Sequence, residues 1–143
     1  MIKLIAVYTK SGNATWDYFL DPATVPADNP VHDTWKECFP NLYGATALEM
    51  FPTIKFTFTA LSSQELHIQW EVPDLETFDE WGYYFSAFTP RPAETFYSLL
   101  EILYPGETIA GRIEIIETVE GFYDSGLYQW LEYWNGPIIK PAG

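Results

Sequence analysis

Apolar and polar side chains alternate along two adjacent segments of the chain. The polar positions of residues 54–60 are Lys55, Thr57 and Thr59, and those of residues 65–72 are Glu65, His67, Gln69 and Glu71. A period of two is typical of strands that bury one face and expose the other. The link of four residues between the segments predicts a hairpin. Residues 2–9 are apolar on both faces, which predicts a central strand.

Helical spacing of apolar residues follows the hairpin. We expect Asp74 to cap a helix with Trp81 at the edge of an apolar face made of Leu75, Phe78, Phe85 and Phe88. Two later helices are predicted from the spacing of Phe96, Leu99, Leu100 and Leu103, and of Leu127, Trp130, Leu131 and Trp134. An earlier helical region spans residues 33–51, with Asp33 as its N-cap and a break near Pro40. Residues 108–119 are rich in β-branched side chains and favour a strand.

This order of elements predicts one α+β domain over residues 1–143. The length suits a single domain with a substantial core. The first six elements match the order of a split βαβ, or ferredoxin-like, sheet. We therefore expect a sheet with helices on one face and an additional C-terminal helix.

The composition adds strong acidity and many aromatic rings. The formal net charge is −13, from 7 basic and 20 acidic residues, and aromatic residues make up 18% of the chain. Such a charge favours solubility and opposes direct binding to nucleic acid or to anionic membranes. The acidity has two interpretations, a solubility device or a binding surface for basic proteins.

The single cysteine and the lack of a recognisable secretion signal predict a location inside the cell. Cys38 is the one cysteine, so no intrachain disulfide forms, as expected for a reducing compartment. The apolar run at residues 4–7 is too short for a secretion signal or a membrane helix. We therefore expect a cytoplasmic location and no membrane association.

Sequence motifs for catalysis, metals and cofactors are sparse, so we do not favour an enzyme. His67 lies among carboxylates on the polar face of its strand, where it is either an acid–base group or simply solvated. Glu117 points inward if its strand alternates strictly, which would make it a candidate acid. A β-bulge at Ile115 and Ile116 would return Glu117 to solvent, and the adjacent isoleucines favour either that bulge or a strand covered on both faces. Cys38 with His32 is interpreted as a buried thiol rather than a nucleophile, and we predict no metal or cofactor.

Acidic residues cluster between residues 65 and 80. No basic residue lies between Lys55 and Arg91. Like charges three and four residues apart destabilise a helix, and a basic partner would relieve that repulsion. Tyrosines beside the cluster are typical of binding surfaces, although they also cap core edges. The candidate partner-binding residues are Glu65, Glu71, Asp74, Glu76, Asp79, Glu80, Tyr83 and Tyr84.

These observations favour an acidic interaction protein that binds a basic protein surface. The most specific version of this hypothesis is a nucleic-acid mimic that inhibits a DNA- or RNA-binding protein. In size, charge and aromatic content the chain resembles the small acidic proteins of phage counter-defence and host takeover. Two alternatives stay open. One is a small-molecule-binding domain or enzyme with an aromatic pocket, and the other is a structural subunit of a homo-oligomer.

Overall fold

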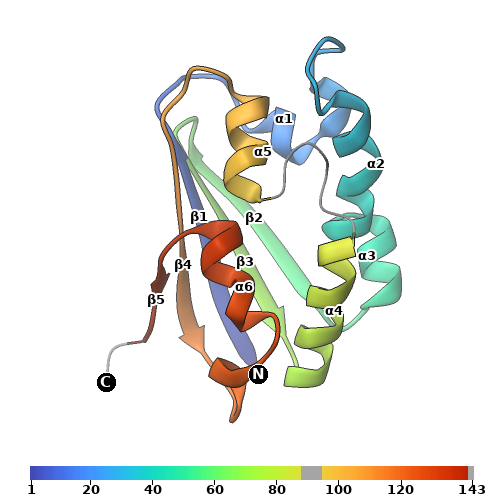
Figure 1. Cartoon of the computed structure of the whole chain (residues 1–143), viewed down its shortest axis with the longest axis vertical. Helices are drawn as coiled ribbons and strands as arrows, with labels where there is room; N and C mark the ends of the chain where they lie inside the picture. The colour runs from blue at the N-terminus through green and yellow to red at the C-terminus, as the bar shows by residue number, and fades with distance from the viewer. Residues whose placement is uncertain (88–94, 142–143) are drawn as a thin grey trace.

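The computed structural model describes residues 1–87 and 95–141 and shows an α+β domain built on one mixed sheet (Figure 1). The strand order is β2-β3-β1-β4-β5. Neighbouring strands are antiparallel except for β4 and β5, which are parallel. The strands are β1 (Ile2–Lys10), β2 (Lys55–Ser62), β3 (Glu65–Val72), β4 (Ile109–Glu117) and β5 (Ile138–Ile139).

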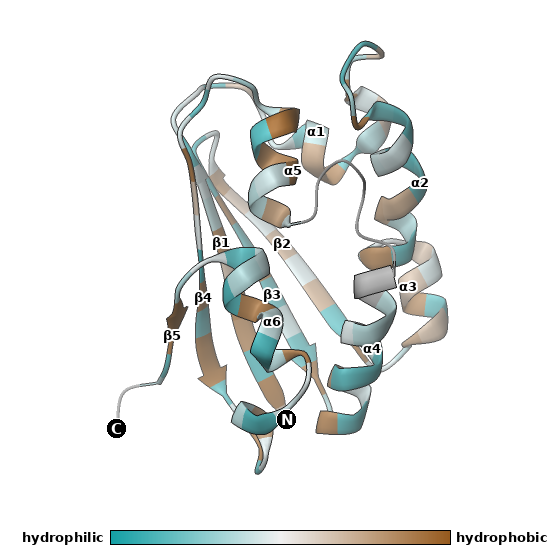
Figure 2. Ribbon diagram, in the orientation of Figure 1, coloured by the Kyte–Doolittle hydropathy of each residue, from teal (hydrophilic) through white to brown (hydrophobic). Residues whose placement is uncertain are grey.

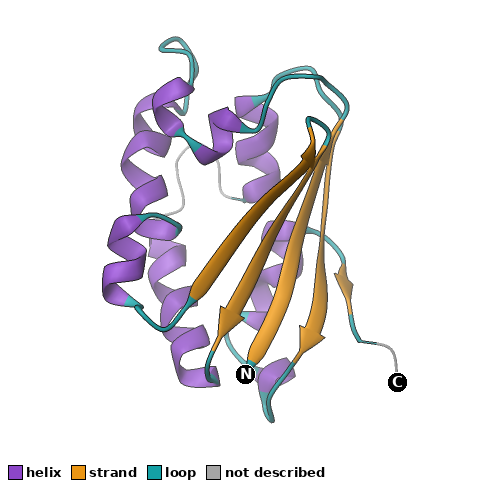
Figure 3. Cartoon of the chain, turned by 180° about the vertical axis from the view of Figure 1, so that it is seen from behind, coloured by secondary structure: helices purple, strands orange, loops and turns teal. Residues whose placement is uncertain are grey.

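The helices cover one face of the sheet and leave the other face open (Figures 1 and 3). Each of the helices α2 to α6 mixes hydrophilic and hydrophobic positions, as helices with one buried side do (Figure 2). Within the described residues, no helix combines the length and the apolar composition needed to cross a bilayer. The helices are α1 (Asp17–Leu20), α2 (His32–Leu42), α3 (Ala45–Met50), α4 (Leu75–Ala87), α5 (Phe96–Leu103) and α6 (Tyr128–Asn135), with 3₁₀ turns η1 (Pro22–Thr24) and η2 (Phe122–Asp124).

The core between sheet and helices is largely aromatic. Tyr43 is central to it, with its ring 5.1 Å from that of Phe56 on β2 and 5.8 Å from that of Phe96 on α5. Trp70 and Trp81 meet edge to face, with 4.8 Å between their ring centroids. The largest fully buried side chains include three tryptophans. Packing therefore accounts for much of the chain's aromatic content.

The hairpin, the central strand and the helix after the hairpin are confirmed. Asp74 accepts a hydrogen bond from the backbone N–H of Thr77 at 2.8 Å, as an N-cap does. Burial of Phe78 is also confirmed, whereas the prediction of Trp81 at the edge is wrong, because it lies fully in the core. Phe88 lies outside the described residues, and nothing is described of the side chain of Phe85.

The helical region before the hairpin begins and breaks at other positions than expected. The prediction of Asp33 as N-cap is wrong: α2 starts at His32, after a turn in which Asn29 Oδ1 accepts from the N–H of Val31. Asp33 instead lies in the first helical turn, where its charge suits the helix dipole. The break falls after Leu42 rather than near Pro40, which lies inside α2.

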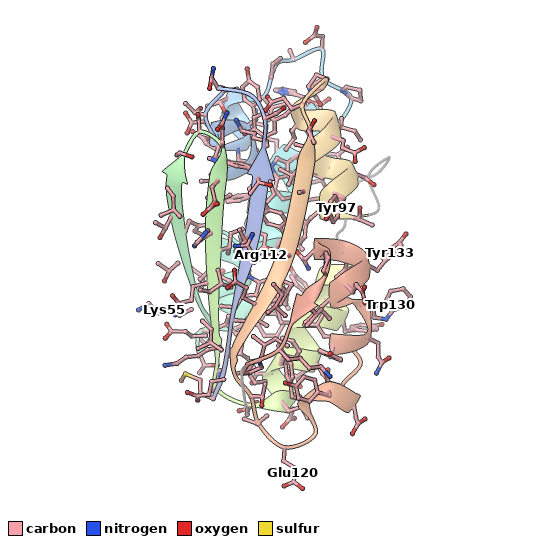
Figure 4. All side chains as sticks on the ribbon, turned by 90° about the vertical axis from the view of Figure 1, so that its left-hand side faces the viewer. Lys55, Tyr97, Arg112, Glu120, Trp130 and Tyr133 are labelled. Carbon is pink, nitrogen blue, oxygen red and sulfur yellow. The ribbon has the colours of Figure 1, made fainter. Side chains whose placement is uncertain are left out.

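The C-terminal helix turns a different side to the sheet than its apolar spacing predicted. Leu127, Leu131 and Trp134 are buried as expected, but Trp130 is 54% exposed. The polar residue Asn135 is buried, although Trp130 is not, and its side chain accepts a hydrogen bond from the hydroxyl of Tyr8 on β1. This buried bond fixes the rotation of α6 and leaves Trp130 and Tyr133 on the outer surface (Figure 4).

The side of strand β4 that faces away from β1 is covered in two ways. The hydroxyl of Tyr97 on α5 accepts from the N–H of Gly111 at 3.0 Å and donates to the C=O of the same residue at 3.1 Å. Further along β4, Ile113 pairs with Ile138 of β5, which the sequence did not predict. Together these contacts pair backbone groups that an edge strand otherwise exposes.

Candidate functional site

The sheet's open face carries one of the two groups of candidate site residues. Glu65, His67 and Glu71 alternate with the buried residues of β3 and so lie on this face. His67 Nε2 lies 2.9 Å from Glu65 Oε2. Its cross-strand neighbours are Thr59 on β2 and Val7 on β1. The side chains of the His67–Glu65 pair are partly exposed, at 27% and 37%.

Every carboxylate of the open face has a nearby positive or titratable partner. Besides the Glu65 pair, Glu71 Oε2 lies 3.8 Å from Lys55 Nζ and Glu114 Oε2 lies 2.8 Å from Arg112 Nε. Glu117 Oε2 lies 3.5 Å from the terminal amino group. The open face is therefore nearly balanced in charge.

Glu117 does not point into the core. Leu4 of β1 pairs with Ile115 and Lys3 pairs with Glu117, so Ile116 is the extra residue of a β-bulge. The bulge turns Glu117 to solvent, where its side chain is 49% exposed. The inward orientation that would have made Glu117 a buried acid is therefore wrong, and the expected bulge is confirmed.

The second group of candidates lies on α4, in the helical layer. Asp74 is the N-cap, and Glu76, Asp79, Glu80, Tyr83 and Tyr84 follow within the helix. The cluster that is continuous in sequence is thus divided between the two sides of the sheet. The Thr77 N–H donating to Asp74 lowers the pKa of that carboxyl below its ordinary value.

Two of these α4 residues also have structural contacts. Asp79 Oδ1 accepts from the backbone N–H of Leu127 at 3.2 Å, which links α4 to the start of α6. The Tyr84 hydroxyl donates to Asn41 Oδ1 of α2 at 3.3 Å. Glu76 and Glu80 are exposed, and Tyr83 is the most exposed large hydrophobic side chain described, at 82%.

A surface hollow of about 520 Å³ lies between the end of α3 and the outer side of α4. It contains four of the candidate residues from the sequence. The two residues at the end of α3 that complete it carried no chemical signal, and only the packing of α3 beside α4 reveals them. The lining residues are Met50, Phe51, Asp79, Glu80, Tyr83 and Tyr84.

Charge is distributed unequally between the two kinds of element. The five strands hold four acidic and four basic residues, whereas the described helices hold nine acidic residues and one basic residue. Within residues 1–87 and 95–141, no carboxylate of α3 to α6 takes part in an ion pair. The helical acids are Asp17, Asp33, Glu37, Glu49, Glu76, Asp79, Glu80, Glu101 and Glu132, and the base is Lys36.

The thiol of Cys38 is buried on α2, and burial raises its pKa above the ordinary value. His32 Nδ1 lies 2.8 Å from the carbonyl oxygen of Val25. A raised pKa disfavours the reactive thiolate, so Cys38 is a packed core side chain rather than a nucleophile. In the part of the chain that the structure describes, no group of three or more His, Cys, Asp or Glu side chains is arranged to hold a metal ion.

Comparison with known proteins gives no match to a family model, a curated protein or a solved structure.

Proposed function

We propose that this protein is an acidic protein-interaction module whose helical surface binds a basic protein. The observation that carries the proposal is the separation of charge between strands and helices. The strands are balanced, while the described helices carry nine acids and one base on the side away from the open sheet face. A surface of one sign attracts partners of the opposite sign and speeds their association.

The most specific version of this proposal is that the protein mimics nucleic acid. A groove that binds DNA or RNA is lined with Lys and Arg that neutralise phosphates. Exposed carboxylates on α4, next to an exposed tyrosine, offer the same groove negative charge and an aromatic ring. The protein would thus compete with nucleic acid for its partner, as an inhibitor of a nucleic-acid-handling protein does.

We also infer the split βαβ arrangement for the first four strands. Their order in the sheet, β2-β3-β1-β4, and their antiparallel pairing support it. The short strand β5 is an addition beside β4. This fold alone carries no conclusion about function.

Capture of the partner tests the proposed function. The tagged protein is incubated with cell lysate, and bound proteins are eluted with rising salt and identified by mass spectrometry. We expect a basic nucleic-acid-binding protein that salt releases and that added DNA or RNA displaces. Bound proteins that neither salt nor nucleic acid displaces would contradict the proposal.

A further inference from the structure

The hollow between α3 and α4 combines an apolar wall with carboxylates. One side is formed by Met50, the last residue of α3, and by Phe51, which follows it, and the aromatic rings of Tyr83 and Tyr84 belong to α4. Asp79 and Glu80 complete the lining from α4. A site of this composition suits a side chain that has an apolar stem and a positive end.

The helical spacing of α4 places a carboxylate next to an aromatic ring, where the positive end of such a side chain would bind. Glu76, Glu80 and Tyr83 are spaced i, i+4 and i+7, so they follow one side of the helix. Glu80 has no cationic partner within the described residues. One Asp79 oxygen already accepts from Leu127, so Glu80 is the carboxylate best suited to a cation from outside.

We propose that the hollow binds one arginine side chain of a basic partner protein. The guanidinium pairs with Glu80 and stacks on the ring of Tyr83, while its methylene stem contacts Met50 and Phe51. Arginine fits better than lysine because its planar, weakly hydrated head both stacks on rings and pairs with carboxylates. This inference rests on the proposed function and names the side chain that anchors the partner.

Methionine methyl groups report on this site directly. The chain has two methionines, Met50 in the hollow and Met1 at the N-terminus, outside the lining residues. With ¹³C-methyl methionine, the two NMR signals give a site probe and an internal control. The probe is the peptide acetyl-Gly-Gly-Arg-Gly-Gly-amide, and its matched control has citrulline, which keeps the shape but loses the charge.

We expect the arginine peptide to shift the Met50 signal in a saturable way and to leave Met1 unchanged. The citrulline peptide should bind about three- to five-fold more weakly, the effect of losing one exposed charge pair. Equal shifts with both peptides would identify an apolar site, and no shift would mean no arginine site. A Met50 shift that depends on protein concentration alone would identify a second copy as the occupant. Each of these three results overturns the proposal.

Variants separate this proposal from the proposed function. Glu80→Gln should weaken arginine-peptide binding about three- to five-fold, and Tyr83→Ala should weaken it by about the same factor through lost stacking. Glu132→Gln on α6 removes the same charge elsewhere and should leave it unchanged. If neither α4 variant affects the peptide or the captured partner, the arginine site is overturned. The proposed function then still stands if nucleic acid continues to displace that partner.

Discussion

At the scale of single residues, Lys10 is the most unusual charge in the molecule. Its side chain is fully buried, and the ammonium lies over the rings of Trp16 and Tyr104, 5.1 Å and 4.9 Å from their centroids. It donates to the carbonyl oxygens of Gly12 and Ala14. Burial lowers the pKa of Lys10, and Glu107, at 3.7 Å, opposes that shift. Lys10 therefore links the loop after β1, which contains Gly12 and Ala14, to the loop before β4, which contains Glu107. The two carbonyl groups, the carboxylate and the two rings together stabilise its charge.

Replacing Lys10 tests this structural role. Lys10→Met keeps an apolar stem but leaves the Glu107 carboxylate and two carbonyl groups without their cation, so we expect a loss of about 2–3 kcal/mol in the free energy of unfolding. Urea denaturation measures it. Lys36→Met, which removes an exposed lysine of α2, is the control and should change stability by less than about 0.5 kcal/mol. Equal effects of the two substitutions would contradict the role of Lys10.

Buried tyrosines predict how stability depends on alkaline pH. Burial raises the pKa of Tyr8, Tyr43 and Tyr104 above the ordinary value of 10.0. Below that pH each is neutral in both states, and above it the unfolded chain loses protons that the folded chain keeps. Stability should therefore fall as the pH rises above about 10, although the lowered pKa of Lys10 acts in the opposite direction.

Tyrosinate absorbance and far-UV circular dichroism, followed together, check this dependence. We expect part of the tyrosinate signal to appear only when the secondary structure is lost. Reversible ionisation of all ten tyrosines with an unchanged circular dichroism spectrum would show that these hydroxyls are not buried.

At the scale of elements, strand β4 shows how one extra residue redirects side chains. Up to the bulge, Ile113 and Ile115 face the core. At the bulge Ile116 is 49% exposed, and Glu117 also reaches solvent. The adjacent isoleucines are alike in chemistry but differ in burial, because a bulge interrupts the period of two.

Alanine at each isoleucine measures this difference. Ile115→Ala should lower the free energy of unfolding by about 2–4 kcal/mol, because it opens a cavity in the core. Ile116→Ala should lower it by less than about 0.5 kcal/mol, as exposed substitutions do. Thermal or urea unfolding of the two variants gives the comparison. Similar losses at both positions would be incompatible with the bulge.

Local patterns predicted the hairpin, the central strand, the Asp74 cap and this bulge, because each depends on residues close in sequence. Features set by distant contacts were missed. Strand β5 has two residues and forms only where the chain after α6 returns to β4. The exposure of Trp130 follows from the bond between Tyr8 and Asn135, residues 127 positions apart. No pattern within α6 contains that information.

At the scale of the whole molecule, the sheet separates a balanced face from an acidic side. The sequence predicted a cluster of acids at residues 65–80 but could not show that strand and helix place them on opposite sides. Alternation directs Glu65 and Glu71 to the open face, beside His67 and Lys55. The acids of α4 have no such partners in the described chain. The wall of the hollow that α3 contributes was likewise beyond prediction, because it depends on helix packing.

Two charge-matched variants test the central claim, that the helical surface carries the interaction. One replaces Glu49, Glu76 and Glu80 of the helices with Gln, and the other replaces Glu65, Glu71 and Glu114 of the open face. Both raise the net charge by the same amount, so any difference between them reports position. The measurement is the affinity for the captured basic partner at several salt concentrations.

We predict that the helical variant binds at least about ten-fold more weakly and with a shallower salt dependence, because three favourable charge interactions are lost. The open-face variant should bind like the unmodified protein. Equal weakening of the two would show that total charge alone matters, and weakening of only the open-face variant would place the interaction on the sheet; either result would contradict this account.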